Sequence, residues 1–441
     1  MPAHYHAGSA LRDYLKPFLR TLGAWQADRL LLLSKGLLQS GGSILSEAGR
    51  KMLRRERKGH VTYVGRIDGW VRKGSMLLEH LPWDDFLLPR HHARLRERCQ
   101  TWQMIVHDES DIAKPWAEKM EGLSTVRDGS TGEMVTGYKL QASIGIGKNP
   151  WDIHPIDVTI VDPTDEDFKS EGRSFQSQIS RLLDEELCRD LLHVLDRGFD
   201  DEKWFQFFGG EKVNWLIRLR KKRNVWFRGE EHPLLTVAET LLSEQRALTV
   251  EDRTYARAEI GITLTHDVTG EKRKKPVRRM YGLVVVRHPC SKTPLLLLTS
   301  ERLHAVKDAV RMYERYLDRW EIEDYLRFLK QTLSVEAMRL MTLPRLRGFL
   351  RLQMLLSDFL LREHAKGREP IGGNGTLWTL LQQSYVCREE TRILSPYVVA
   401  TAVSDRLNVE ARFGHRSEPF PLLLPLAVQP VLFDCTELDR A

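Results

Sequence analysis

The segment 316–331, YLDRWEIEDYLRFLKQ, carries residue types whose spacing would suit chemistry on phosphate groups. Four of its side chains follow the spacing Y-x2-R-x3-E-x6-K, and they are Tyr316, Arg319, Glu323 and Lys330. In a continuous helix, which turns by about 100° per residue, these side chains fall within roughly 60° of one another. A carboxylate held among cations and a phenol suits a divalent metal that binds beside phosphate groups.

Trp320 and Arg327 lie on the same stripe of this predicted helix, whereas Glu321 and Asp324 are rotated away from it. The pattern has a plainer explanation, because charged helices usually present solvated faces with opposite charges four residues apart. Glu323 and Arg327 have that spacing. The motif alone leaves both explanations open, and the acids upstream favour the functional one.

Two aspartates precede this helix at the ends of predicted strands. Asp108 follows the apolar run that starts at Thr101, and Asp196 ends a short strand at 193–196. The separations are 88 residues from Asp108 to Asp196 and 127 residues from Asp196 to Glu323. Acids at the carboxyl ends of neighbouring strands point into the crevice where ligands bind. Three such carboxylates suit two Mg²⁺ ions about 3.5–4 Å apart, which support in-line phosphoryl transfer.

Each aspartate also has a simpler explanation, since acids at strand ends are commonly loop residues or helix caps. Asp111 follows the same predicted strand and competes with Asp108 as the first acid. We prefer Asp108 because it comes directly after the apolar run. Asp111 is expected to start a helix that contains Pro115.

Composition narrows the class of protein. The chain has 441 residues, of which 42% are hydrophobic, so it can hold two or three domains with real cores. Its net charge is +7, and residues 1–100 hold 18 Lys and Arg against 9 Asp and Glu, which fits a nucleic-acid partner. Five dispersed cysteines without zinc-ligand spacing indicate a reducing cytoplasm. No apolar run is long enough to span a membrane, and the start of the chain has no signal-peptide pattern.

Periodicity predicts a helical region at 9–100, with a turn near Leu81-Pro82, followed by an α/β region. The strands expected there are a run from Thr101 that ends before Asp108, then 133–145, 153–161, 193–196, 213–220, 281–286 and 295–299, the first three being antiparallel neighbours. The helices expected are 175–192, 201–208, one continuous helix from about His304 to Gln331, and 343–363. Residues 221–280 alternate like β structure and are expected to form an inserted subdomain.

Strand-Asp, strand-Asp and helix-Glu in this order, together with the complete Y-x2-R-x3-E-x6-K pattern, resemble the DDE transposases of bacterial insertion sequences. The closest resemblance is to the type 4 group, which carries the YREK signature. The segments VHDES at 106–110 and LDRGFD at 195–200 look like the first and second catalytic blocks of that family. A long β insertion before the glutamate is also a trait of the group. The resemblance covers roughly residues 100–360.

The resemblance implies an α/β fold, with a ribonuclease H-like mixed sheet flanked by helices, an inserted β subdomain and a helical N-terminal region. It implies a DNA-binding region at 1–100, a catalytic core at 101–365 with its insertion at about 221–300, and a C-terminal region at 366–441 that we assign to dimerisation. The expected location is the bacterial cytoplasm, in association with the nucleoid, and no membrane partner is expected.

The resemblance implies cut-and-paste DNA transposition. Asp108, Asp196 and Glu323 would bind two Mg²⁺ ions, for which Mn²⁺ can substitute. The predicted DNA contacts are Tyr316, Arg319, Arg327 and Lys330, together with Trp320, for which stacking on an unpaired base and packing against the sheet both stay open. Water would free a 3′-OH at the end of the element, and in this group that 3′-OH forms a hairpin, which is reopened before attack on target DNA. The partners implied are double-stranded DNA, as terminal inverted repeats and target, and a second copy of the chain in the DNA complex.

Three basic runs, at 51–58, 218–223 and 272–279, are expected to hold DNA backbone, although any one alone could be a solvated face. The rival functions are a metal-dependent nuclease on the same fold, which would cut without joining, and a non-catalytic DNA-binding protein. A tyrosine recombinase would need a tyrosine nucleophile among Arg and His residues near the C-terminus, and Tyr397 has no such setting.

Overall fold

The computed structural model describes residues 6–53, 62–129, 131–187, 189–244, 247–267, 271–366 and 395–413. Its contacts divide the chain into two compact units, each described below by itself. The first unit holds the described residues up to Arg189 and from Glu321 onward, and the second holds Asp190–Trp320. The end of the basic run at 51–58 and the C-terminal tail from Gly414 lie outside the described residues.

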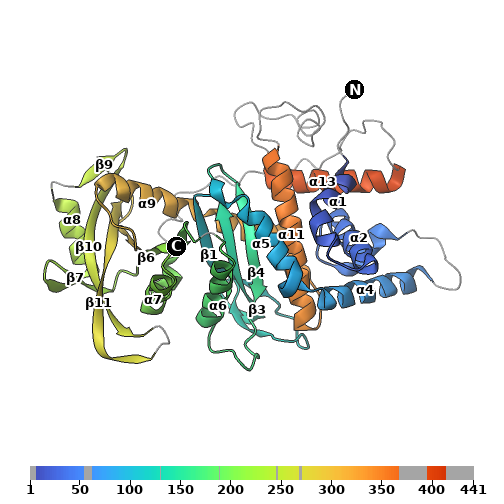
Figure 1. The fold of residues 1–441 in the computed structure, drawn as a ribbon, viewed down its shortest axis with the longest axis horizontal. Coiled ribbons are helices and arrows are strands. Elements are labelled where there is room, and N and C mark those ends of the chain that lie inside the picture. The colour runs from blue at the N-terminus through green and yellow to red at the C-terminus, as the bar shows by residue number, and fades with distance from the viewer. Residues whose placement is uncertain are drawn as a thin grey trace. The chain divides into compact units, whose positions relative to one another are not determined.

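The first unit begins with helices that bury one apolar face each. They are α1 (Ala7–Leu19), α2 (Ala24–Ser40), α3 (Leu45–Met52), α4 (Tyr63–His80) and α5 (Leu88–Arg96) (Figure 1). In α1, the fully buried Leu11, Leu15 and Phe18 recur at helical spacing, which is why this stretch is an amphipathic helix. The helical region and the turn at Leu81-Pro82 were predicted, and both are confirmed.

The strands of this unit are β1 (Met104–Ala113), β2 (Ser124–Arg127), β3 (Met134–Ile146) and β4 (Ile153–Ile160). β3 pairs antiparallel with β1 along one edge and with β2 and β4 along the other. The predicted antiparallel neighbours are therefore confirmed, and β2 is an additional strand. The prediction that the first strand ends before Asp108 is wrong, as is the helix expected at Asp111. Both acids lie inside β1, because the ladder with β3 continues as far as the pair Ala113 and Gly137.

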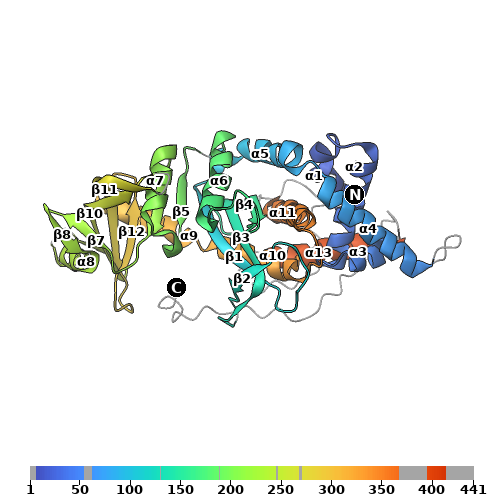
Figure 2. The same cartoon turned by 90° about the horizontal axis from the view of Figure 1, so that it is seen from below.

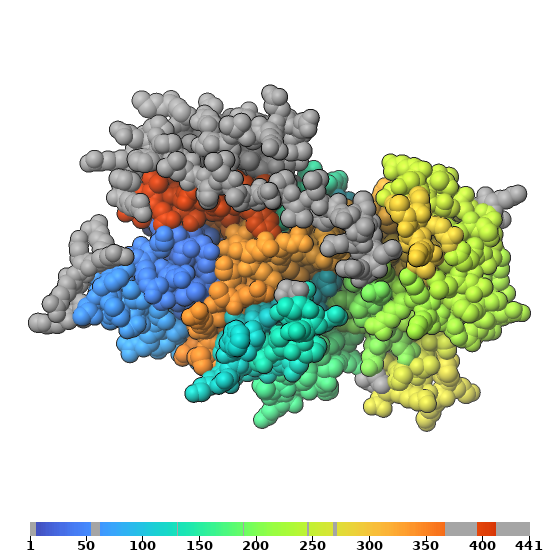
Figure 3. Space-filling model, turned by 180° about the vertical axis from the view of Figure 1, so that it is seen from behind, coloured from blue at the N-terminus to red at the C-terminus, as the bar shows by residue number. Residues whose placement is uncertain are grey.

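The remaining helices of the first unit are α6 (Glu171–Asp184), α10 (Glu321–Gln331), α11 (Leu343–Lys366) and α13 (Pro396–Phe413) (Figure 2). α11 is buried along most of its length and packs against β4, α4 and α13. Gly348 permits this packing, since a Cβ there would lie 2.2 Å from the Leu78 carbonyl oxygen. In Figure 3 the orange segment that contains α11 lies between the blue N-terminal helices and the teal strands.

A buried polar network ties the N-terminal helices to α11. Asp358 of α11 is fully buried and accepts a hydrogen bond of 2.8 Å from the hydroxyl of Tyr14 on α1. Arg362, one turn later on α11, lies 2.8 Å from the same carboxylate. Burial would raise the pKa of Asp358, but Arg362, His91 and Tyr14 outweigh it and lower the pKa to about 2. The helical region and the strands of this unit therefore share one core.

The second unit is built on a mixed sheet with the strand order β5-β6-β12-β11-β10-β7-β8, and β9 pairs with β10. Its strands are β5 (Leu192–Leu195), β6 (Asn214–Arg218), β7 (Asn224–Phe227), β8 (Glu230–Pro233), β9 (Leu248–Val250), β10 (Arg253–His266), β11 (Lys272–Arg287) and β12 (Leu295–Thr299). β5 and β6 are parallel, and the other pairs are antiparallel. The β residues after position 221 thus extend the sheet that starts at β5.

The helices of the second unit are α7 (Glu202–Glu211), α8 (Leu234–Ser243) and α9 (Val306–Asp318). The continuous helix predicted from His304 to Gln331 is wrong, because α9 ends in a tight turn at Arg319 and Trp320. The amides of these two residues bond to the carbonyls three residues earlier, at 3.3 and 3.0 Å. α10 then starts with three acids in its first turn, where the helix dipole favours negative charge. The six predicted stripe residues therefore do not share one helix.

Among the helices in the described ranges, none combines the length and the apolar composition needed to cross a membrane.

Candidate active site

Asp196 stands at the carboxyl end of β5, where the sequence placed it. The four residues of β5, LHVL, are fully enclosed because both faces of this strand are covered. β6 runs parallel to it with Leu195 opposite Ile217, so Asp196 and Arg218 follow at the same edge of the sheet. A short 3₁₀ turn, Arg197–Phe199, then carries the chain away from the sheet. The strand thus presents a carboxylate at its end, as a ligand-binding edge requires.

Two residues of the helical motif converge on Asp196. The hydroxyl of Tyr316, on α9, donates a hydrogen bond of 2.8 Å to Asp196 Oδ1. Arg319 ends the same helix, and its guanidinium carbon lies 5.6 Å from the centre of the Tyr316 ring. Both side chains are buried, with exposed fractions of 7% for Tyr316 and 5% for Arg319. The spacing of three residues therefore places a phenol and a guanidinium on one face of α9, against the second predicted acid.

The charges around Asp196 keep it ionised. Burial would raise the pKa of Asp196, but the Arg319 charge, the Arg197 amide, the Tyr316 hydroxyl and the Arg218 charge together lower it. Burial and the Asp196 charge raise the pKa of Tyr316, so its phenol stays protonated and keeps donating. An ionised carboxylate is the form that a hard cation such as Mg²⁺ binds. The state of Asp196 therefore fits the predicted metal-ligand role.

Asp108 and Glu323 belong to the first unit. Glu323 lies in the first turn of α10, which packs against β1. Asp108 lies in the middle of β1, opposite Ala142, and accepts a 2.8 Å hydrogen bond from the Glu109 amide. In the described part of the chain, no group of three or more His, Cys, Asp or Glu side chains is placed so that it could hold a metal ion. The grouping of Asp108, Glu323 and Asp196 in one metal site remains a prediction.

Asp108 and Asp111 point to opposite faces of β1, because side chains alternate along a strand. His107, on the Asp111 face, packs edge-on against Phe175 of α6 at 5.9 Å. On that face Asp111 lies 3.8 Å from Lys139, which is also 3.6 Å from Glu109. Asp111 is thus part of a charged cluster beside α6, whereas Asp108 faces away from α6.

The other motif residues have separate surroundings. Lys330 forms an ion pair of 3.4 Å with Glu336, and its charge lowers the pKa of Asp111, which burial nevertheless raises overall. Arg327 pairs with Asp324 at 2.9 Å. Trp320 is partly buried in the turn after α9. The structure therefore brings Tyr316 and Arg319 to Asp196. Contact with DNA stays a prediction for these two residues as well as for Lys330, Arg327 and Trp320.

Arg218 is a neighbour of Asp196 whose electrostatic effect on that carboxylate was not predicted. The sequence had assigned it only to a basic run expected to bind DNA backbone. The available signal was the parallel pairing of 193–196 with 213–220, since parallel neighbours end at the same edge and bring their following residues together. That pairing was not predicted, because β5 is only four residues long.

Comparison with known proteins gives one family match and one similar solved structure among those found. Residues 170–358 match the family model of the transposase DDE domain, a range that includes Asp196, Tyr316 and Glu323 but not Asp108. This match supports a DDE transposase. No curated protein matches the chain. Among solved structures, the chain is similar to a piggyBac transposase in a synaptic complex with hairpin DNA, at 8% identity and a TM-score of 0.42, with 92% of this chain and 78% of that chain covered.

Proposed function

We propose that this chain is a transposase of a bacterial insertion sequence, of the YREK group, and that it cuts and joins DNA with the help of metal ions. The observation that carries the proposal is the contact of Tyr316 and Arg319 with Asp196. Two residues of a motif read from the sequence hold an acid that lies 120 residues earlier in the chain, inside the range that matches the transposase DDE domain. If the motif were only a solvated face of charged residues, two of its side chains would not be expected to surround an acid on another element.

Within this proposal, Asp108, Asp196 and Glu323 would hold two Mg²⁺ ions, or Mn²⁺ in their place. Such ions activate an attacking oxygen and stabilise the leaving one. Tyr316 and Arg319 orient Asp196 and keep its carboxylate ionised. Lys330, Arg327 and Trp320 would contact the DNA at the end of the element. The first two residues of the motif, Tyr316 and Arg319, would therefore have a role toward the Asp196 carboxylate in addition to any contact with a DNA phosphate.

Strand cleavage, hairpin formation and joining would all take place at this one site. A water molecule attacks a phosphodiester and frees a 3′-OH, and that 3′-OH then attacks the opposite strand and forms a hairpin. After the hairpin is reopened, the same 3′-OH attacks target DNA. The protein would act as a homodimer that pairs two ends of the element, so that both ends join one target.

The proposal is tested by incubating the purified protein with Mg²⁺ or EDTA, DNA that carries the element's ends, and a target plasmid. We expect new 3′-OH ends, a hairpin on the excised fragment and joined products, all dependent on the metal. Cutting without joining would identify a nuclease instead. Binding with no cutting under any metal condition would identify a non-catalytic DNA-binding protein.

A further inference from the structure

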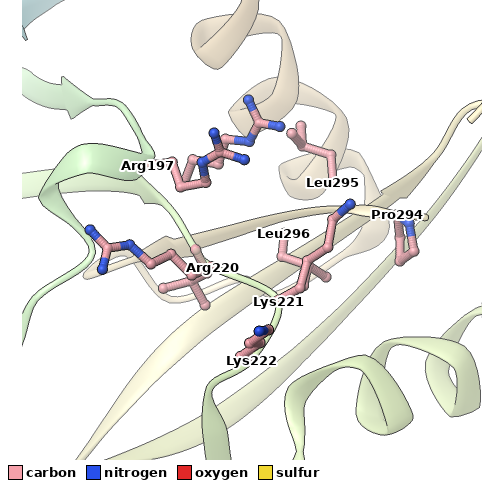
Figure 4. Close-up of a pocket in the computed structure, with 9 residues that line it drawn as sticks. Arg197, Arg220, Lys221, Lys222, Pro294, Leu295 and Leu296 are labelled. Carbon is pink, nitrogen blue, oxygen red and sulfur yellow. The ribbon is translucent and has the colours of Figure 1, made fainter. Parts of the chain in front are cut away.

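A cation-lined cavity lies next to Asp196 within the second unit. Its volume is about 360 Å³, and its cationic lining residues are Arg197, Arg218, Arg220, Lys221 and Lys222. The apolar segment 294–296, at the start of β12, forms the rest of the wall, and no acid lines the cavity. In Figure 4, the side chains of Arg220 and Lys221 leave the chain after β6 in different directions.

The loop that supplies these cations is held in place by a buried acid. The carboxylate of Asp200, 5% exposed, accepts a hydrogen bond of 2.6 Å from the Arg220 amide. The same carboxylate pairs with the guanidinium of Arg223, which also lies 5.3 Å from the centre of the Phe205 ring. Asp200 thereby holds the backbone at Arg220 and the side chain of Arg223. The backbone at Arg220 is therefore held before an anion binds, while the side chains at 220–222 are exposed and can reach it.

Apart from Arg218, whose charge acts on Asp196, the cations that line the cavity have no acidic partner in the described part of the chain. Lys221 donates to the hydroxyl of Thr293, which carries no charge. Arg197, Arg220 and Lys222 form no ion pair within the described ranges. Cations that line one cavity repel each other, and an anion with several oxygens relieves that repulsion. Phosphate groups meet this requirement, and arginine is the side chain best shaped to bind them.

The position of the cavity indicates which phosphates these are. Arg197 directly follows Asp196, and the charge of Arg218 already acts on the Asp196 carboxylate. If Asp196 stands at the scissile phosphate, as proposed above, the cavity lies beside that phosphate, because its lining residue Arg197 is the next residue in the chain. We infer that the cavity binds two or three consecutive phosphates of the DNA strand next to the bond that is cut. This inference rests on the proposed function and names a subsite of the same substrate.

The first test measures how DNA binding depends on salt. The variant Arg220→Gln/Lys222→Gln removes two cations from the cavity without touching Asp196 or Asp200. Each lost phosphate contact lowers the slope of log K against log salt by about 0.9, so we expect a slope smaller by about two. Because phosphate contacts carry no sequence information, the affinity should fall by the same factor for element ends and unrelated duplexes.

The matched control is Arg302→Gln/Lys307→Gln, which removes one arginine and one lysine from exposed positions of the same unit outside the cavity. Its slope should stay within about 0.5 of the wild-type slope, by the per-contact value above. Equal slopes for the two double variants would overturn the inference. If wild-type protein neither cuts nor joins DNA, the proposed function fails instead, whatever the slopes show.

The second test locates the phosphates. Single phosphates of the substrate are replaced by uncharged methylphosphonates, one position at a time, on each side of the cleavage point. Wild-type protein should lose affinity at two or three adjacent positions, and the cavity variant should be insensitive at those positions. Equal losses in both proteins would place the DNA elsewhere. Binding of inorganic phosphate by the cavity, with unchanged DNA slopes, would identify a small-anion site unrelated to DNA and would also overturn the inference.

Discussion

The hydrogen bond between Tyr316 and Asp196 can be removed by the substitution Tyr316→Phe. The tyrosine ring is buried, and phenylalanine keeps the ring while it removes only the hydroxyl that donates to Asp196 at 2.8 Å. Asp196 then relies on the Arg319 charge, the Arg197 amide and the Arg218 charge alone. The change thus isolates one hydrogen bond in the candidate site.

The expected size of the effect follows from that bond. A hydrogen bond to a charged acceptor contributes about 1.5–3 kcal/mol, and about 1.4 kcal/mol corresponds to a factor of ten in rate. Because Asp196 keeps its cationic neighbours, we expect the lower end of the range, a fall of about tenfold in the rate of strand cleavage. The bond lowers the pKa of Asp196, so its loss raises that pKa and moves the acid limb of the pH–rate profile to higher pH.

The assay is single-turnover cleavage of end-labelled DNA across a range of pH, with Tyr313→Phe as the matched control. Tyr313 lies one turn earlier on α9, is equally buried at 8% exposed, and packs against Tyr255 rather than against an acid. The control should keep the wild-type profile. An unchanged acid limb in Tyr316→Phe, or the same shift in both variants, would refute the proposed role of the hydroxyl.

Three further predictions concern the first unit. Asp358→Asn should lower the free energy of unfolding by about 3 kcal/mol in urea, because it breaks a buried ion pair. The pKa of Asp358 in the folded protein is about 2, below its ordinary 3.8, so the free energy of unfolding of wild type should decrease as pH falls from 3.8 to 2. The variant, which has no carboxylate there, should not show this decrease. Gly348→Ala should lower the melting temperature, since its Cβ would meet the Leu78 carbonyl at 2.2 Å. Asp108→Asn should abolish DNA cleavage, while Asp111→Asn should retain it, and the reverse result would make Asp111 the first acid.

Local patterns predicted much of the fold. Apolar residues at helical spacing, as in Leu11, Leu15 and Phe18, gave the N-terminal helices, because an amphipathic face must be buried whatever covers it. Most strands were found from short apolar runs between turn residues. Their pairing was predicted only for β1, β3 and β4, where tight turns make antiparallel neighbours the natural choice.

The errors arose where tertiary contacts override local preference. Asp108 and Asp111 looked like the end of a strand, yet the long partner β3 supplies hydrogen bonds past both acids. The break after Arg319 was missed because periodicity continues across it, although the acids Glu321, Glu323 and Asp324 mark a new helix start. α8 was missed because its sequence, LLTVAETLLS, lies in a region rich in β-forming residues.

The candidate site was also predicted from the sequence only in part. Residue types and spacing were enough to select Asp196, Tyr316 and Arg319 as members of one site, and the structure places these three together. The hydrogen bond of Tyr316 to Asp196 and the nearby Arg319 charge were not predicted, and the assignment of Tyr316 and Arg319 to DNA phosphates stays a prediction. The contribution of Arg218 depends on the parallel pairing of β5 with β6, which no local pattern reveals.

Glu323 is proposed to act with Asp108 and Asp196 in metal-dependent cutting and joining of DNA. The most direct measurement compares wild type, Glu323→Gln and Asp324→Asn for binding, cleavage and strand transfer on element-end DNA in Mg²⁺. Asp324 is the matched control, since it is an acid in the same helical turn whose partner is Arg327. We expect Glu323→Gln to bind DNA like wild type but neither to cut nor to join it, while Asp324→Asn does both. Cleavage and joining that persist in Glu323→Gln would contradict this proposal.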